Sequence, residues 1–341
     1  MLQFRNETGL AGTIFISPDP DGVDTVYAVV KGTFALAGVP EWGELAPAAE
    51  QLPMAPAPEH HGDPATTSIR VPSDTSLVKP ATDVLLVGHA HAPGGRPASV
   101  VDVALTVGPL RKHVRVFGDR VWTEGALGTT ASPPEPFARM PLVWERAFGG
   151  TEQVDDALHA EPRNPVGTGF SAPGSARAPE GLPLPNLEDP ERPIASPKDA
   201  PPPAGFAPLS GHWEPRRSYA GTYDDAWQKH RAPYLPTDFD PRFFQLAPPE
   251  LVARGYLQGG EPVELLGATP GGVPLRFCLP AVRVTVAYLL DGGPRPVSAE
   301  LDTVLVEPDA GRVLLTWRAA LACDKRALRV REVRATVARH R

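Results

Sequence analysis

Short apolar and β-branched runs, separated by turns that contain proline and glycine, occupy both ends of the sequence. In the first part of the chain they lie at residues 13–16, 24–36, 83–92, 99–107 and 110–117. In the last part they lie at residues 262–267, 275–279, 282–290, 300–307, 313–322 and 327–338, with hairpin turns at 291–293 and 308–311. Such runs are typical of antiparallel strands in a sandwich or barrel. The pattern indicates one short helix, at residues 248–255, with Glu250 early and Arg254 late.

The middle of the chain, residues 126–249, has a different character. It lacks a periodic apolar pattern, holds more than half of the 43 prolines and is rich in aromatic residues. A disordered segment would be poor in aromatics, and aromatic side chains can pin irregular backbone to a sheet. We therefore expect an ordered, loop-rich aromatic layer between an N-terminal β half (1–125) and a C-terminal β half (250–341). The prediction is an all-β fold with little helix, in which a mainly antiparallel sandwich or barrel-like sheets form one compact domain.

The net charge and the two ends of the chain argue against some classes of function. The net charge of −7 and the pI near 5.7 argue against nucleic acid as a partner, because nucleic-acid binders usually present a basic face. The last sixteen residues are locally basic, and apolar and charged residues alternate at 328–331, which predicts the wet face of an edge strand. The first residues lack a signal-peptide pattern, and no apolar run is long enough to span a bilayer. We expect a cytoplasmic protein with no membrane partner.

Histidine and aspartate provide the first candidates for chemistry. His89 and His91 alternate on one predicted strand, so their side chains project from the same face, as metal ligands would. A metal site needs a further convergent ligand, and the spacing marks none. Asp224, Asp238 and Asp240 suggest calcium, but the EF-hand pattern is absent and aspartate commonly caps turns. The sequence therefore predicts no metal.

Other candidates for catalysis are weaker. Glu145 and Glu188 could serve as paired carboxylates in glycoside hydrolysis, but the sequence does not fix their separation. Cys278 and Cys323 are the only cysteines and are expected as small buried hydrophobes. The sequence has no serine nucleophile elbow, no phosphate-binding glycine loop and no His-Glu-x-x-His. We predict no catalytic residue and no cofactor.

Several segments, in order along the chain, resemble a known family. They are residues 73–84, 88–93, 116–122, 140–150, 164–170, 184–190, 203–206, 220–224 with Trp227, and 235–240. With them the chain resembles, over roughly residues 10 to 320, the domain-of-unknown-function family 2169 of bacterial proteins, which is encoded beside type VI secretion genes. The resemblance implies an adaptor or chaperone that loads a toxic effector onto the VgrG/PAAR spike. The family carries no established catalytic set.

Two groups of residues follow as candidates. The first would contact a partner protein, because tryptophan and tyrosine dominate binding hot spots: Trp213, Tyr219, Tyr223, Trp227 and Tyr234. The second belongs to the family motifs and is expected to join the loop layer to the sheets: Asp83, His89, His91, Asp119, Arg120, Trp144, Glu145, Arg146, Asn164, Asn186, Glu188, Asp224, Asp238 and Asp240. The alternative is a hydrolase-like enzyme whose carboxylate or histidine site is assembled only by the fold.

Overall fold

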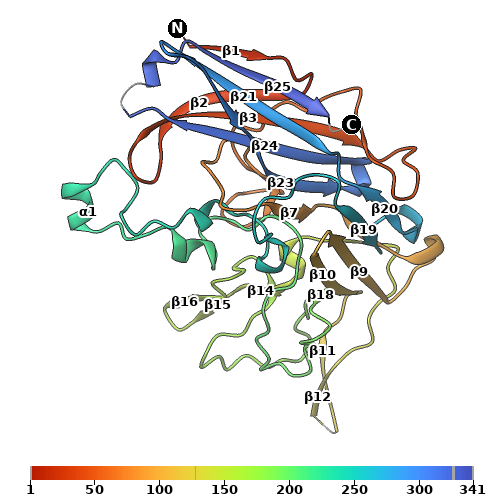
Figure 1. Ribbon diagram of the computed structural model, residues 1–341. Helices are drawn as coiled ribbons and strands as arrows, with labels where there is room; N and C mark the ends of the chain where they lie inside the picture. Colours follow the sequence, from red (N-terminus) through yellow and green to blue (C-terminus); the bar gives the residue numbers. More distant parts are fainter. Residues whose placement is uncertain (1, 127, 325–326, 340–341) are drawn as a thin grey trace.

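The computed structural model describes residues 2–126, 128–324 and 327–339. Over these residues the protein is mainly β, with 41% strand, one short α-helix and several mostly antiparallel sheets. This confirms the predicted fold class. Figure 1 shows the sheets stacked from the end that holds both termini toward a loop-rich end with small hairpins. Within the described residues, no helix is long and apolar enough to cross a bilayer.

The central sheet draws strands from both ends of the sequence. In spatial order these are β2 (Ala11–Pro18), β3 (Asp24–Ala35), β24 (Arg312–Ala322), β23 (Glu300–Glu307) and β7 (Asp83–Leu86), with β4 (Ala46–Pro47) added to β3. Strand β3 is buried from Thr25 to Phe34, so both faces of the sheet are covered there. For this reason its sequence is a nearly continuous apolar run and not an alternating one. β7 pairs with β23 in parallel, and the other pairs are antiparallel.

A four-stranded sheet packs on the central sheet and holds both ends of the described chain. Its order is β1 (Gln3–Asn6), β25 (Glu332–Arg339), β21 (Val282–Leu290) and β22 (Gly293–Ser298). The prediction of a basic edge strand is wrong, because β25 lies between β1 and β21. Val333 and Ala335 are buried while Arg334 is partly exposed. An interior strand with one solvent-exposed face therefore shows the same alternation of apolar and charged residues as an edge strand. The predicted strand also starts too early, since residues 327–329 form a 3₁₀ turn.

A five-stranded sheet lies on the other side of the central sheet in Figure 1. Its order is β18 (Leu187–Glu188), β10 (Leu110–Phe117), β9 (Val100–Val107), β19 (Pro262–Leu266) and β20 (Leu275–Cys278). Strand β9 alternates between exposed and buried positions, as expected for a sheet with one face in the core. One apolar cluster includes Val30 of the central sheet, Val103 of this sheet and Val284 of the four-stranded sheet. The three sheets therefore share one core.

The remaining elements are short and lie mainly in the connecting layers. The strands are β5 (Glu59–His60), β6 (Ile69–Val71), β8 (His89–His91), β11 (Trp122–Gly125), β12 (Gly128–Ala131), β13 (Arg139–Pro141), β14 (Phe148–Gly149), β15 (Thr151–Val154), β16 (Ala157–Ala160) and β17 (Thr168–Gly169). The 3₁₀ turns are η1 (Pro93–Gly95), η2 (Trp144–Arg146), η3 (Arg216–Tyr219), η4 (Pro241–Phe244), η5 (Pro249–Leu251), η6 (Pro270–Gly272), η7 (Pro308–Ala310) and η8 (Ala327–Arg329). The predicted run 83–92 is split into β7 and β8.

The helix prediction is wrong in position. Residues 248–255 contain only the turn η5, because Val252 is extended and bridges to Asp83, which ends the turn. The helix α1 instead spans Asp225–His230. Asp224 caps it, since its carboxylate accepts a hydrogen bond from the Trp227 amide at 2.8 Å. The signal for this helix was therefore a capping aspartate and not an apolar period.

Candidate functional site

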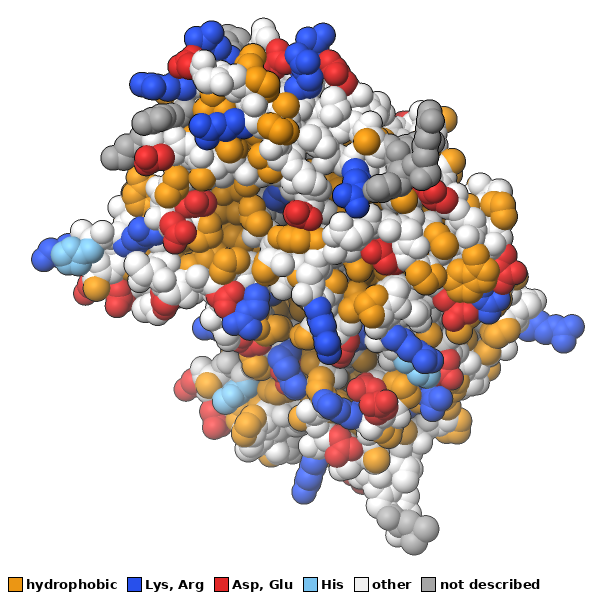
Figure 2. Space-filling view, viewed as in Figure 1, with side chains coloured by type: hydrophobic (Ala, Val, Ile, Leu, Met, Phe, Trp, Pro, Cys, Tyr) orange, Lys and Arg blue, Asp and Glu red, His pale blue; other side chains and the backbone are white. Residues whose placement is uncertain are grey.

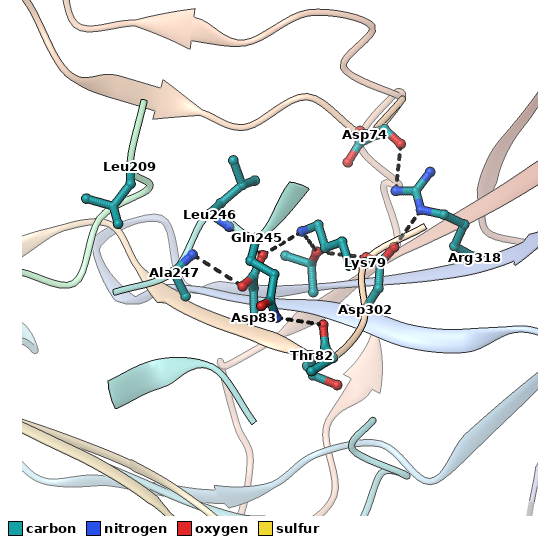
Figure 3. Close-up of polar contacts among 12 residues, drawn as sticks. Asp74, Lys79, Thr82, Asp83, Leu209, Gln245, Leu246, Ala247, Asp302 and Arg318 are labelled. Atoms are coloured by element: carbon teal, nitrogen blue, oxygen red, sulfur yellow. Dashed lines mark hydrogen bonds and ion pairs between the residues drawn. The ribbon is translucent and has the colours of Figure 1, made fainter. Parts of the chain in front are cut away.

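Asp83, at the start of β7, joins the central segment to the central sheet. Its carboxylate accepts hydrogen bonds from the amides of Leu246 (2.8 Å) and Ala247 (3.3 Å). It also pairs with Lys79 Nζ at 2.8 Å, and this ammonium donates to the Thr303 hydroxyl at 2.6 Å. The side chains of Lys79 and Asp83 are buried, and Figure 3 shows them among their polar contacts. A buried charge requires such partners, so this pair fixes where residues 245–247 lie.

The same network continues through the neighbouring strands. Thr303 donates to Asp302, whose other oxygen pairs with Arg318 Nε at 2.6 Å. Arg318 Nη2 then donates to the Asp74 carbonyl at 3.0 Å, and the Asp74 carboxylate pairs with Lys31 at 2.5 Å. All of these side chains are nearly inaccessible to solvent. Three cations and three carboxylates therefore balance one another inside the fold.

Two further groups of motif residues connect the loop layer to the five-stranded sheet. Arg146 donates to Asp119 at 2.8 Å and to the Asn186 side chain at 3.0 Å. Asn186 in turn donates to Asp119 at 2.9 Å, which closes a triangle. Arg120 and Glu188 form a buried ion pair. Glu188, a candidate carboxylate for hydrolysis, is thus held by a guanidinium in the protein interior.

The motif around residue 145 packs within the loop layer and also joins this layer to Ser68, just before β6. Both Glu145 oxygens accept hydrogen bonds from Ser68, one from its amide (2.7 Å) and one from its hydroxyl (2.8 Å). Asn164 donates to the carbonyl of Trp144 at 2.8 Å, and Trp144 is buried. A Cβ at Gly149 would lie 2.1 Å from the Asn164 carbonyl oxygen, so only glycine permits this approach. These contacts give every one of these residues a packing role.

His89 and His91 both contact Asp309, a residue that the sequence pattern does not identify as a candidate. His89 Nδ1 and His91 Nε2 each lie 2.7 Å from a different oxygen of Asp309, which belongs to η7. Arg139 donates to His89 Nε2 at 3.1 Å, so the His89 proton is on Nδ1. Burial raises the pKa of Asp309, but the hydrogen bonds from both imidazoles outweigh it and leave that pKa below its usual range. Among the described residues, no three His, Cys, Asp or Glu side chains are placed to hold a metal ion.

The predicted partner-binding aromatics divide into one core residue and a surface group. Trp213 is completely buried and packs edge-on against Trp144, with ring centroids 6.4 Å apart. It is not a surface contact, and we remove it from the partner-binding candidates. The others lie in residues 216–244, which we call the aromatic lobe. In Figure 1 its helix α1 projects from the body, and Figure 2 shows hydrophobic side chains in a hollow between this projection and the sheets.

The aromatic lobe keeps a defined shape through its own contacts. Tyr223 and Tyr234 are 53% and 40% exposed. Tyr223 packs edge-on against Trp227 at 4.7 Å, and the Trp227 indole donates to the Tyr234 carbonyl at 2.9 Å. Arg231 donates to the Pro20 carbonyl at 2.9 Å, which ties the lobe to the turn between β2 and β3. The lobe therefore presents aromatic side chains from anchored backbone.

The acidic residues of the aromatic lobe hold its turns. Asp238 accepts hydrogen bonds from the Thr222 amide (3.0 Å) and hydroxyl (2.7 Å), and these lower its pKa. Asp240 pairs with Arg242, whose guanidinium lies 4.3 Å from the centroid of the Tyr219 ring. Asp238 therefore joins two segments of the lobe that lie sixteen residues apart, whereas Asp240 accepts from the amide two residues on, as is usual for aspartate in turns.

Comparison with known proteins identifies the family. The sequence model of a family described as an uncharacterized protein conserved in bacteria (DUF2169) matches residues 21–318. The chain belongs to this family. No curated protein and no solved structure matches the chain. The matched part of the DUF2169 chain begins in the turn before β3 and ends within β24, so it contains the buried network and the aromatic lobe.

The DUF2169 chain also has an apolar pocket of about 340 Å³ beside the loop layer. Trp144 and Leu209 line it, together with five prolines and four charged residues: Pro202, Pro203, Pro215, Pro248, Pro249, Lys112, Arg163, Glu214 and Glu250. Of the charged residues, Lys112 and Glu250 form an ion pair at 3.0 Å. Proline walls offer no amide donors, so the pocket has the character of an apolar recess.

Proposed function

We propose that this DUF2169 protein is a cytoplasmic, non-catalytic adaptor or chaperone. It binds a secreted effector and helps to load the effector onto the type VI secretion spike. The resemblance of its motifs implies this role, and the exposed aromatic lobe is the observation that supports it best. Tyr223 and Tyr234 combine large contact area with a polar hydroxyl, which is the chemistry of binding hot spots.

The construction of the aromatic lobe favours binding in a second way. Trp227 supports the Tyr223 ring, and Arg231 fixes the backbone to the β2–β3 turn. A side chain that is already held in place loses less conformational entropy when a partner binds. The net charge of −7 would add long-range attraction toward a basic effector, and this attraction weakens as salt rises.

Replacement of Tyr223 by alanine tests this proposal. We expect the variant to fold and to bind the effector encoded by the neighbouring gene about 2 kcal/mol less tightly, roughly a thirtyfold loss. Affinity is measured by titration of the purified effector, together with co-purification from cells. The matched control is Leu158→Ala, which truncates another exposed apolar side chain, on β16, and should leave the affinity unchanged. Normal effector secretion from cells without this protein, with no co-purification, would contradict the adaptor role.

A hydrolase is the second candidate function, and the contact of His89 and His91 with Asp309 favours it. Histidine and carboxylate in hydrogen-bond contact are the usual parts of a general acid–base site. Under the adaptor proposal, elemental analysis of protein purified without chelator or affinity tag should give no stoichiometric transition metal. A stoichiometric metal that disappears in the His89→Ala, His91→Ala double variant would support the hydrolase instead.

A further inference from the structure

Trp42 is an exposed aromatic residue in a costly backbone conformation. Its φ is +61°, in the left-handed region, and its side chain is 46% exposed. Bulky residues rarely adopt positive φ, whereas glycine adopts it without steric cost. Residues held in such conformations concentrate at functional sites. The turn therefore keeps a large indole at the surface where glycine would fit with less strain.

The turn that carries Trp42 is fixed to the edge of the five-stranded sheet. The Trp42 amide donates to the Arg276 carbonyl at 3.2 Å, and the Gly43 carbonyl accepts from the Cys278 amide at 2.9 Å. Both partners belong to β20, the outer strand of that sheet. The indole is thus held by main-chain contacts, and none of these involves the aromatic lobe.

Glu41 and Glu44 flank Trp42 in the sequence, and Arg276 connects the indole to two carboxylates. The Arg276 guanidinium lies 5.9 Å from its ring centroid and pairs with Glu41 (2.8 Å) and Glu264 (2.7 Å). Glu44, two residues after Trp42, is also exposed, and one of its oxygens accepts a backbone hydrogen bond. Three carboxylates and one guanidinium leave this surface with a net negative charge. Arg276 lies at the outer limit of a cation–π contact with the Trp42 ring, and the exposed part of the indole offers the same interaction to a second cation.

We propose that Trp42, Glu41 and Glu44 form a second binding point, which takes an arginine side chain from an extended basic segment of a protein partner. The guanidinium would stack on the indole and pair with a carboxylate, a geometry that arginine favours over lysine. The carboxylates would repel phosphate, so the chemistry of this surface favours a protein over a nucleic acid or an anionic membrane. This binding point does not depend on the adaptor role, because it uses different elements of the fold.

Nuclear magnetic resonance of the tryptophan indole N–H groups tests the proposal. The probe is a short synthetic peptide of alternating glycine and arginine, and the matched control peptide has citrulline in place of arginine. The Trp42 signal is assigned by its loss in Trp42→Phe. We expect this signal to shift saturably with the arginine peptide, less so at high salt, and not with the citrulline peptide. The double variant Glu41→Gln, Glu44→Gln should weaken binding by roughly threefold or more.

Two results separate this inference from the adaptor proposal. Tyr223→Ala should leave the Trp42 shifts unchanged, because Tyr223 belongs to the aromatic lobe. Failure of the effector to bind would likewise leave these shifts in place. Equal shifts with both peptides, or no shift of the Trp42 signal, would overturn the arginine-binding assignment. Unchanged signals from the buried tryptophans establish that each variant is folded.

Discussion

Replacing Asp83 with alanine is expected to destabilise the fold by about 3–5 kcal/mol, the cost typical of breaking a buried ion pair from one side. The change leaves the Lys79 ammonium buried, with the Thr303 hydroxyl as its remaining partner. It also removes the acceptor for the amides of Leu246 and Ala247. The ammonium and the two amides are buried, so water cannot replace the hydrogen bonds that they lose.

Unfolding in urea, followed by tryptophan fluorescence, measures this effect. The matched control is Asp119→Ala, because the Asp119 carboxylate also pairs with a cation, Arg146, but the Asp119 side chain is 62% exposed. We expect the control to lose about 1 kcal/mol or less. The double variant Asp83→Leu, Lys79→Met should be more stable than Asp83→Ala, since it leaves no unpaired buried charge. A loss in Asp83→Ala as small as that expected for Asp119→Ala would contradict a stabilising role of the buried network.

Local pattern was sufficient to predict strands whose ends are marked by turns. Residues 110–117, 282–290 and 300–307 are strands with the predicted boundaries, and each is followed directly by a turn residue, namely Gly118, Asp291 or Pro308. Pairing between distant strands leaves no such local mark. The parallel register of Asp83 with Thr303 is an example. For the same reason β25 was assigned to an edge although two strands flank it.

The sequence could mark single polar residues of the site, but it could not show which residues they contact. Asp83 belongs to a family motif, whereas its network partners Asp302 and Arg318 do not stand out in the sequence. Polar residues within a strand usually face solvent, so the pattern does not reveal that these two are buried. Asp309 was part of a predicted hairpin turn, and nothing in the spacing linked it to His89. Tryptophans in irregular segments have a similar ambiguity, because no period indicates whether the ring points inward. Trp213 was misplaced at the surface for this reason.

Trp213→Ala should cost about 3–5 kcal/mol of stability, in contrast to the surface aromatic Tyr223. The indole is fully buried and packs edge-on against Trp144, so its removal leaves a cavity and an unsupported ring. Tyr223→Ala, at an exposed position, should change the unfolding free energy by roughly 0.5 kcal/mol or less. Urea unfolding of the two variants under the same conditions makes this comparison.

Effector affinity should show the reverse order: Tyr223→Ala should lower the affinity, and Trp213→Ala should not. At a temperature where Trp213→Ala remains folded, its affinity should match that of the unsubstituted protein, because the buried ring cannot touch a partner. Tyr223→Ala should bind more weakly at every temperature, since its loss removes contact area without unfolding the chain. If folded Trp213→Ala lost as much affinity as Tyr223→Ala, partner binding would depend on the packing beneath the loop layer as well as on the exposed aromatics.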